Sequence, residues 1–353
     1  MSALHDLAAA VLRALDPEVA HGATIRLLRA GLGPRAPRGG QPRLAVNLCG
    51  LALDNAVGLA AGFDKNAETP DAMLAAGFGF VECGTVTPLP QAGNPPPRLF
   101  RLAEDRAVIN RMGFNNAGLE PFAARLAQRQ RRGVVGANIG ANKDSADRIG
   151  DYVAGLERLW GLADYFAVNI SSPNTPGLRA LQTRQALAEL LGRLGAARAA
   201  LSARGGRHPV FLKVAPDLVE DEIEAVVETS VANGLDAIIV GNTTLSRPET
   251  LKSPQKSEAG GLSGAPLTTL STRVLGQFYQ AASGRLALIG VGGIAGGADA
   301  YAKIRAGARA VQLYSAMVYE GPGLVRRVRR ELDARLAADG FASISEAVGA
   351  DHV

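Results

Sequence analysis

The segments ALIGVGGI (287–294) and AVQLYSA (310–316) decide the fold of this chain. Each starts with a short apolar run and ends in small or polar residues, and a stretch of helical character separates the two. An apolar run, a helical stretch and a second apolar run are typical of a β-α-β unit, whose two strands lie parallel in one sheet. The two segments therefore predict neighbouring parallel strands joined by a helix.

Six more runs of this kind precede them. They are NAVGLAAG near residue 57, GFVECGTV near 82, GVVGANIG near 136, YFAVNIS near 168, PVFLKVA near 212 and AIIVGNTT near 240. The stretches between them, such as 182–204 and 217–233, carry Ala, Leu, Glu and Arg with helical periodicity. Eight β units with helical crossovers predict an α/β protein built as a closed (β/α)8 TIM barrel. A doubly wound open sheet is the alternative, and the count of eight favours closure.

The length of 353 residues suits one such barrel, because α/β barrels often exceed about 250 residues once insertions are counted. The paired runs at 44–48 and 51–53 predict a hairpin that closes the bottom of the barrel.

The N-terminal 34 residues differ from the rest and predict two amphipathic helices. The first has Leu4, Leu7, Val11, Leu12 and Leu15 at helical spacing. Asp16 and Pro17 mark the start of the second, whose apolar residues are Val19, Ala20, Ala23, Leu27 and Leu28, and Gly31 to Pro34 end it. We therefore divide the chain into a helical pair (1–34) and a barrel domain (35–353). The pattern leaves open whether the pair is a cap packed on the barrel or a hairpin that lies on a membrane and admits a lipid-soluble ligand.

The composition favours a packed α/β enzyme, with 47% hydrophobic residues, 20% charged residues and 42 glycines. The net charge of +5 is spread along the chain without a basic block, so we expect no nucleic-acid partner. Two cysteines, Cys49 and Cys83, lie in apolar runs and predict no disulfide framework. The histidines, at 5, 21, 208 and 352, lack metal-ligand spacing, so we expect no metal. No signal peptide and no apolar run of about 18 residues is evident, which favours the cytoplasm.

The unusual residues of the chain follow the predicted strands, where a barrel of this kind carries its active site. The strands end in AAGFDKN, GTVTP, NIGANKD, NISSPNTPG, KVAPD, GNTT, GVGGI and LYSA. These ends are rich in Asn, Lys, Ser and Thr and poor in carboxylates. They predict a site for polar amides and anions.

The last two strand ends predict a phosphate site. Gly290, Gly292 and Gly293 end the seventh strand, and Tyr314 and Ser315 end the eighth, at the place where barrels often hold a phosphate. Lys213 lies within the fifth apolar run, and a lysine in a barrel interior requires an anionic partner, such as a reduced flavin. Together these features predict FMN rather than a dinucleotide, and no GxGxxG motif follows the first strand.

The loop NISSPNTPG (169–177) is the most informative segment for the substrate. Two prolines stiffen a loop rich in amides and hydroxyls, which either cap a rigid turn or bind a ligand. Asn110, Asn242 and Thr243 add similar groups at other strand ends. Asn side chains match the N–H and C=O edge of a cyclic imide such as a dihydropyrimidine, and Lys65 could meet a carboxylate.

These residues resemble the class 2, quinone-dependent dihydroorotate dehydrogenases. The matching strings run from about residue 12 to 323 in the expected order: LDPEVAH, AAGFDKN, NRMGFNNAG, NIGANKD, NISSPNTPGLR, GGLSGAPL, GVGGI and VQLYSA. The resemblance implies oxidation of dihydroorotate to orotate in pyrimidine biosynthesis, with one FMN per chain and a membrane quinone that reoxidises it.

The resemblance also implies roles for individual residues. Ser172 is the base that takes the C5 proton while a hydride passes from C6 to flavin N5. The substrate contacts are Lys65, Asn110, Arg111, Met112, Gly113, Phe114, Asn169, Asn174, Asn242 and Thr243. The FMN contacts are Ala61, Gly62, Thr85, Asn138, Asn169, Lys213, Gly264, Gly293, Tyr314 and Ser315. His21 and Arg101 match quinone-side positions.

The class follows from Ser172, because the related class 1 enzymes have a cysteine at the base's position. In class 2 a helical pair like residues 1–34 covers the flavin edge and admits the quinone, which implies a peripheral protein on the cytoplasmic face of the cell membrane. Gly241 and Ala141 depart from the family pattern, where a threonine or serine and a lysine are common. Three rivals remain: a class 1 enzyme that uses fumarate or NAD, an FMN barrel for another pyrimidine-like ring, and a catalytically silent flavin-binding module.

Overall fold

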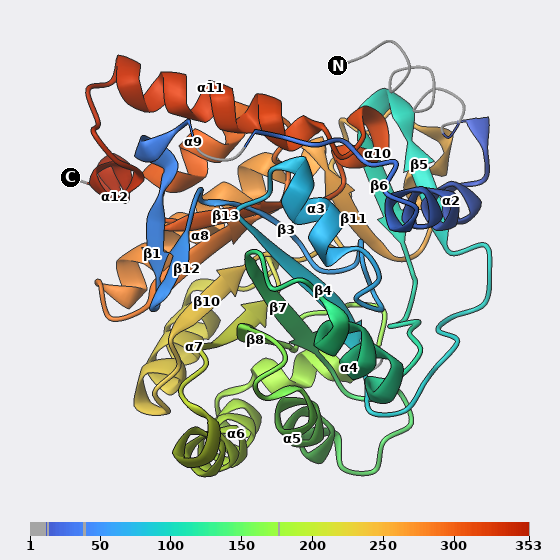
Figure 1. Ribbon diagram of the computed structural model, residues 1–353, viewed down its shortest axis with the longest axis vertical. Coiled ribbons are helices and arrows are strands. Elements are labelled where there is room, and N and C mark those ends of the chain that lie inside the picture. The colour runs from blue at the N-terminus through green and yellow to red at the C-terminus, as the bar shows by residue number, and fades with distance from the viewer. Residues whose placement is uncertain (1–11, 13, 38–39, 176, 353) are drawn as a thin grey trace.

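The computed structural model describes residues 12, 14–37, 40–175 and 177–352, and its centre is a closed barrel of parallel strands (Figure 1). In order around the barrel, its strands are β3 (Val57–Leu59), β4 (Phe80–Val86), β7 (Val134–Ile139), β8 (Tyr165–Asn169), β9 (Val210–Val214), β10 (Ala237–Val240), β12 (Ala287–Val291) and β13 (Ala310–Leu313). β13 pairs with β3 and closes the ring. Each strand lies in one of the eight predicted runs, so the closed barrel is confirmed and the open sheet was the wrong alternative.

Helices surround this barrel. They are α3 (Pro70–Ala76), α4 (Leu119–Gln128), α5 (Arg148–Leu159), α6 (Arg184–Gly205), α7 (Glu220–Ala232), α8 (Thr268–Ala282), α9 (Gly297–Arg305), α10 (Met317–Glu320), α11 (Leu324–Ala338) and α12 (Ile344–Ala347), with 3-10 turns at Pro42–Leu44, Ala103–Asp105, Leu178–Gln182, Pro254–Ser257, Ala265–Leu267 and Ala350–His352. Local signals set several ends. The side chain of Asp147 caps α5 by accepting from Gly150 N, and α3 begins at Pro70 and ends at Gly77, whose φ is +117°.

The barrel interior is aromatic at its lower end and polar above. Alternate residues of a strand point inward, so Phe80, Tyr165 and Phe211 form one layer, with ring centroids 6.3 Å and 4.9 Å apart. Glycines on neighbouring strands make room for these rings: a Cβ on Gly136 would lie 2.1 Å from the Tyr165 ring. Two residues further along β9 the next inward side chain is Lys213, which begins the polar layer below the site.

The predicted hairpin forms at the opposite end from the site. β1 (Val46–Leu48) pairs antiparallel with β2 (Leu51–Leu53). Cys49 lies in the turn between them, with a φ of 54°, and not within a strand as its apolar surroundings suggested. Its thiol donates to Asp236 O at 3.3 Å. Asp236 directly precedes β10, so the hairpin covers the amino ends of the barrel strands as predicted.

A three-stranded antiparallel sheet, which the sequence did not predict, lies beside the barrel. β5 (Leu99–Leu102) and β11 (Gly261–Gly264) flank β6 (Ala107–Asn110). The three strands are four residues each and come from two separate insertions between barrel strands. A pattern search within one segment misses such a sheet, because its register is set by chain segments about 150 residues apart.

The predicted second N-terminal helix is α2 (Pro17–Arg29), which lies beside β5 and β6 in Figure 1. Asp16 Oδ1 accepts from Glu18 N and Val19 N and caps it, as expected from the sequence. Its buried residues are Ala20, Ile25 and Leu28, whereas Val19 and Leu27 of the predicted apolar set are exposed. The first predicted helix falls mostly on residues outside the described ranges. None of the described helices has the length and apolar character needed to cross a bilayer.

Candidate active site

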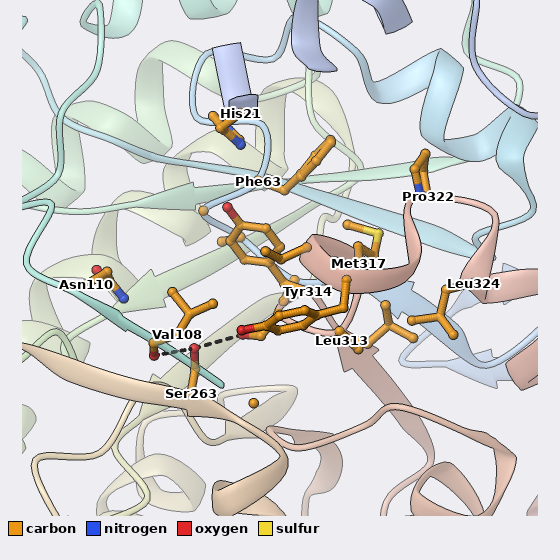
Figure 2. A pocket seen from close by; sticks show the side chains of 18 of the residues that line it. His21, Phe63, Val108, Asn110, Ser263, Leu313, Tyr314, Met317, Pro322 and Leu324 are labelled. Carbon is orange, nitrogen blue, oxygen red and sulfur yellow. Dashed lines mark hydrogen bonds between the residues drawn. The ribbon is translucent and has the colours of Figure 1, made fainter. Parts of the chain in front are cut away.

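A cavity of about 900 Å³ opens at the carboxyl ends of the barrel strands. Its floor consists of strand ends and of the loops that follow them, and residues of β5, β6, β11 and α2 line its sides and entrance. Figure 2 shows Tyr314 and Phe63 in this cavity with His21 of α2 beyond them. The three rings meet edge to face, with centroids 5.5 Å apart for His21 and Phe63 and 5.7 Å apart for Phe63 and Tyr314.

Nearly all residues singled out from the sequence line this one cavity. They are His21, Ala61, Gly62, Lys65, Thr85, Arg101, Asn110, Met112, Gly113, Phe114, Asn169, Ser172, Asn174, Lys213, Asn242, Thr243, Gly264, Gly293, Tyr314 and Ser315. The exceptions are Asn138 and Arg111. Since these residues come from segments spread between positions 21 and 315, the fold gathers what the sequence only suggested.

The two exceptions lie close by in different ways. Asn138 is fully buried in the barrel, where it links Thr85 to Glu82 through its side-chain amide. Arg111 points away and forms an ion pair of 2.8 Å with Glu258, while its guanidinium lies over the Phe100 ring. Asn138 can therefore position a ligand contact, and Arg111 stabilises the β6 to β11 region.

Lys213 has an anionic partner, as its position in the barrel interior predicted, and that partner is a residue of the protein. Its Nζ lies 3.1 Å from Glu82 Oε1, and Glu82 is fully buried. The same carboxylate accepts from Asn138 Nδ2 at 2.7 Å and from Gln312 Nε2 at 2.8 Å. A buried carboxylate with this many donors is well compensated, so the pair fixes the polar layer directly under the cavity.

Glu82 and Gln312 are the main residues that sequence reasoning missed. Each is a polar side chain within an otherwise apolar strand run, which is the same signal that identified Lys213. Gln312 lines the cavity, and its Oε1 is buried without a hydrogen-bond partner among the described residues. That free acceptor faces a region where a ligand N–H would satisfy it.

The loop after β8 is held by its own first residue. Asn169 Oδ1 accepts from Ser171 N at 3.2 Å and from Ser171 Oγ at 2.8 Å, and its Nδ2 donates to Thr85 Oγ1 at 2.9 Å. Tyr152 OH donates to Asn169 O from α5 at 2.7 Å. These bonds leave Ser172 to project into the cavity, where its Oγ accepts from Asn174 N at 3.3 Å.

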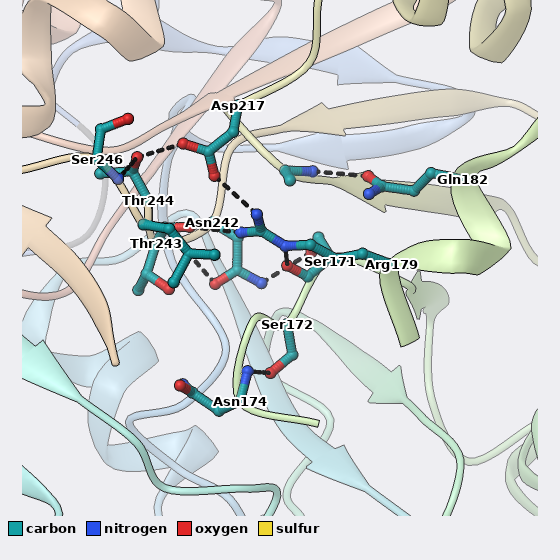
Figure 3. A network of polar contacts seen from close by, with 12 residues as sticks. Ser171, Ser172, Asn174, Arg179, Gln182, Asp217, Asn242, Thr243, Thr244 and Ser246 are labelled. Carbon is teal, nitrogen blue, oxygen red and sulfur yellow. Dashed lines mark hydrogen bonds and ion pairs between the residues drawn. The ribbon is translucent and has the colours of Figure 1, made fainter. Parts of the chain in front are cut away.

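A partly buried ion pair supports this loop from behind, as Figure 3 shows. Arg179 donates to Ser171 O and Thr243 O, both at 3.2 Å, and pairs with Asp217 at 3.0 Å. Thr244 Oγ1 also donates to Asp217. The guanidinium therefore ties the loop after β8 to the loop after β10, which keeps their ligand-facing side chains in register.

Three side chains on these loops and on β6, those of Asn110, Asn174 and Thr243, retain a polar atom without a partner among the described residues. Asn242 donates to Ser171 Oγ at 2.8 Å, and Asn174 Nδ2 donates to Asn110 Oδ1 at 3.2 Å. Asn110 Nδ2 and Asn174 Oδ1 have no partner among the described residues. Thr243 Oγ1 is buried and also without one. The cavity thus offers both donors and acceptors, as a planar ring with N–H and C=O groups requires.

Lys65 and His21 are ionisable groups of the cavity whose pKa values are strongly shifted. Burial lowers the pKa of Lys65 to about 8, although the Glu18 carboxylate on α2 raises it. Burial and the charge of Lys65 lower the pKa of His21 to about 3, so its imidazole is neutral. Glu18 itself pairs with Arg98 at 2.6 Å, which ties α2 to the segment before β5.

The far end of the cavity is lined by loops with free backbone N–H groups. Gly292 and Gly293 have φ values of +106° and +76°, a conformation that side chains rarely allow. The N–H groups of Gly293, Ile294 and Ser315 have no acceptor among the described residues. Such converging N–H groups make an anion-binding concavity, so this end suits a phosphate.

The two departures from the family pattern have structural counterparts. Gly241 has a φ of +122°, and a Cβ there would lie 2.5 Å from Val291 O, so this backbone requires glycine. Ala141 is fully buried, which leaves no room for a lysine in the same packing.

Comparison with known proteins gives one family. A family model described as dihydroorotate dehydrogenase matches residues 43–336. The protein named dihydroorotate dehydrogenase (quinone) of Parvibaculum lavamentivorans is 56% identical over 349 residues, with 99% of each chain covered. That of Xanthobacter autotrophicus is 57% identical over 346 residues, with 97% of each covered. Among solved structures, DHODH from Eimeria tenella in complex with ferulenol is 44% identical, covers 96% of each chain and has a TM-score of 0.92.

Proposed function

Since the chain belongs to the dihydroorotate dehydrogenase family, we propose that it oxidises dihydroorotate to orotate in pyrimidine biosynthesis, with FMN as cofactor and a membrane quinone as final electron acceptor. The observation that carries this proposal is the convergence of Lys65, Ser172 and the unpaired amide groups of Asn110 and Asn174 on one cavity. These groups match a carboxylate, an acidic C–H and an imide edge on one small ring.

The cavity fits FMN on observations made on this chain alone. Its far end has free N–H groups on two adjacent loops, and its floor holds the Lys213 ammonium and the unpaired Gln312 Oε1. FMN offers a phosphate for the free N–H groups, a carbonyl edge for the Lys213 ammonium and an N–H for Gln312 Oε1. Ala61, Gly62, Thr85, Asn169, Lys213, Gly264, Gly293, Tyr314 and Ser315 would hold it, with Asn138 positioning Thr85 from below.

The substrate would bind between the flavin site and the loop after β8. Oxidation removes a proton from C5 and a hydride from C6 of the dihydropyrimidine ring and leaves a double bond between these carbons. When bound, FMN supplies the acceptor of the hydride. Lys65 would pair with the substrate carboxylate, and Asn110, Asn174, Asn242 and Thr243 would hold the imide edge. Backbone groups of Met112 and Gly113, with Phe114, would close the other side, and Arg111 would act only through the loop it supports.

Ser172 would receive the C5 proton. Its Oγ has one described partner, the N–H of Asn174, so a lone pair is free to face the substrate. A serine hydroxyl is a weak base, and it therefore passes a proton on rather than keeps it. Water that enters the cavity is the receiver available to it, because no carboxylate or imidazole among the described residues bonds to Ser172.

The quinone would approach past α2. Ala20, His21, Thr24, Leu27 and Leu28 of this helix line the entrance of the cavity, and Arg101 donates from β5 to Leu15 O at 2.7 Å. Mostly apolar side chains of small to medium size suit a lipid-soluble ring better than a charged nucleotide. We propose that residues 1–34 form a unit that rests on the cytoplasmic face of the membrane, and that residues 35–353 form the catalytic unit.

One anaerobic titration tests the proposal. Dihydroorotate is added to the purified flavin-loaded protein while the flavin absorption band is followed, and a quinone, fumarate or NAD is then offered separately. We expect bleaching by dihydroorotate and reoxidation by the quinone alone. Persistent absorption after dihydroorotate would refute the assigned substrate, and reoxidation by fumarate or NAD would indicate a class 1 enzyme.

A further inference from the structure

Lys303 is a fully buried lysine outside the candidate site. It lies on α9, and its Nζ donates to Ser271 Oγ at 2.7 Å and to Thr272 Oγ1 at 3.0 Å, both in α8. No carboxylate of the described part of the chain lies within ion-pair distance of it. Burial lowers the pKa of Lys303 to about 7, while the charge of Asp299 raises it. A buried cation is costly, and the lowered pKa is a consequence of that cost.

The lysine is linked to a loop of the cavity by one hydroxyl. Ser271 Oγ accepts from Lys303, and its two acceptors are Gly292 O at 3.0 Å and Thr268 O of its own helix at 3.2 Å. A charged ammonium can only donate, so it occupies a lone pair of the serine and commits the hydroxyl proton to a carbonyl. The shorter of the two contacts goes to Gly292 O, so the serine links Lys303 to the peptide between Gly292 and Gly293.

That peptide decides where an N–H of the cavity points. A trans peptide is planar, and its N–H lies on the opposite side from its C=O. Since Gly292 O faces α8, the N–H of Gly293 faces away from α8, and Gly293 lines the cavity. Thr268 Oγ1, also on α8, donates to Gly293 O at 3.0 Å and orients the N–H of Ile294 in the same manner. Both N–H groups lack an acceptor among the described residues.

We propose that Lys303 is a positioning residue for the FMN phosphate, which acts from behind the loop through Ser271 and the Gly292–Gly293 peptide and adds a buried positive charge beneath the anion. This inference rests on the proposed FMN site. A Cβ on Gly293 would lie 2.1 Å from Thr268 Oγ1, so α8 backs directly on the loop and little can intervene between them. The lysine thus selects for the phosphorylated flavin without touching the ring.

Riboflavin provides the test, because it has the same ring system as FMN but no phosphate. The full-length chain, freed of flavin, is titrated with FMN and with riboflavin while flavin fluorescence is measured. Lys303→Met should weaken FMN binding about tenfold, the usual effect of losing a hydrogen bond to a charged group, and leave riboflavin binding nearly unchanged. Ser271→Ala should do the same, and the double variant should be no weaker than the stronger single one.

Thr272→Val is the matched control. It removes the second hydroxyl that Lys303 contacts, but among the described residues the Thr272 hydroxyl makes no hydrogen bond to Gly292 or Gly293, so the preference for FMN over riboflavin should persist. Equal losses of FMN and riboflavin affinity in Lys303→Met would overturn the inference and indicate a purely structural lysine. The inference would also be overturned if Lys303→Met bound both flavins as tightly as the parent chain does. If Lys303→Met does not fold, the same comparison of FMN and riboflavin affinity in Ser271→Ala tests the inference. A parent chain that binds neither flavin would instead contradict the proposed function.

Discussion

At the scale of single residues, the catalytic proposal depends on the Ser172 hydroxyl, which has few hydrogen-bond partners within the protein. Its one described hydrogen bond comes from Asn174 N, and the neighbouring Ser171 takes the strong contacts to Asn169 and Asn242. The two adjacent serines thus differ in their surroundings: Ser171 holds the loop and Ser172 faces the cavity.

Ser172→Ala should slow reduction of the flavin by dihydroorotate by roughly 10² to 10⁴, the usual range for loss of a positioned base, while FMN remains bound. Stopped-flow absorbance under anaerobic conditions measures the rate, and the flavin content of the purified protein checks the binding. Reduction at the unaltered rate would remove Ser172 from the mechanism.

Lys65 gives the site a pH dependence. Its pKa is lowered to about 8 by burial, so in the ligand-free enzyme the ammonium is present below that pH and lost above it. Because only the ammonium attracts the substrate carboxylate, kcat/KM for dihydroorotate should fall as the pH rises through about 8. The Lys65→Met variant should bind substrate weakly throughout and lack this descending limb. A parent profile without a break in that region would contradict the assigned contact.

The ion pair of Glu82 and Lys213 is the residue-scale feature with the largest expected effect on stability. Glu82→Gln keeps the shape but leaves a buried ammonium without its carboxylate, so the free energy of unfolding should drop by about 3–5 kcal/mol. Urea denaturation of the flavin-free chain measures it. The double variant Glu82→Gln with Lys213→Met, which removes both charges, should regain most of the loss. If the double variant lost as much free energy of unfolding as Glu82→Gln and Lys213→Met lose together, the two charges would not interact.

At the scale of elements, α2 is the part of the chain whose role its sequence pattern left open. The helix buries Ile25 and Leu28, presents Ala20 and His21 to the cavity and leaves Val19 and Leu27 exposed. One face thus packs on the barrel side, and apolar side chains remain on the other. This arrangement fits a helix that caps the barrel and equally a helix that contacts a membrane. A functional measurement is therefore needed to distinguish the two roles.

Deletion of residues 1–31 should impair quinone reduction and binding to lipid vesicles more than the bleaching of the flavin by dihydroorotate. The two half-reactions are measured separately by stopped flow, and vesicle co-sedimentation measures the binding. Ala20→Trp is a milder companion variant, since it fills the entrance without removing the helix, and it should raise KM for the quinone only. Equal loss of both half-reactions on deletion would assign the segment a structural role.

At the scale of the whole molecule, a cavity bounded by strand ends from all around the barrel couples cofactor binding to global stability. A ligand that binds only the folded state stabilises it by about 2.7 kcal/mol at a free concentration one hundred times its Kd. Removal of FMN should therefore lower Tm, and added FMN should restore it in a concentration-dependent manner. Differential scanning calorimetry measures both. A Tm that does not respond to FMN would mean that FMN does not bind preferentially to the folded chain, which would contradict the proposed cofactor.

Much of this architecture could be predicted from the sequence, because it depends on local patterns. Apolar runs of strand length, separated by helical stretches, predicted every barrel strand and the hairpin 46–53. The Asp16 cap and the loop 169–177 were equally readable, since caps and proline-stiffened turns depend on neighbouring residues.

Only the tertiary structure decided which groups meet. The sequence identified Lys213 as a buried cation, but not that its partner is Glu82, 131 residues earlier on another strand. It suggested a contact for Arg111 that the ion pair with Glu258 redirects. It gave no sign that Lys303 is linked through Ser271 to Gly292 in the lining of the cavity. Strand and helix patterns are set by residues a few positions apart. These pairs form only when the chain folds and brings distant segments together, so no local sequence pattern predicts them.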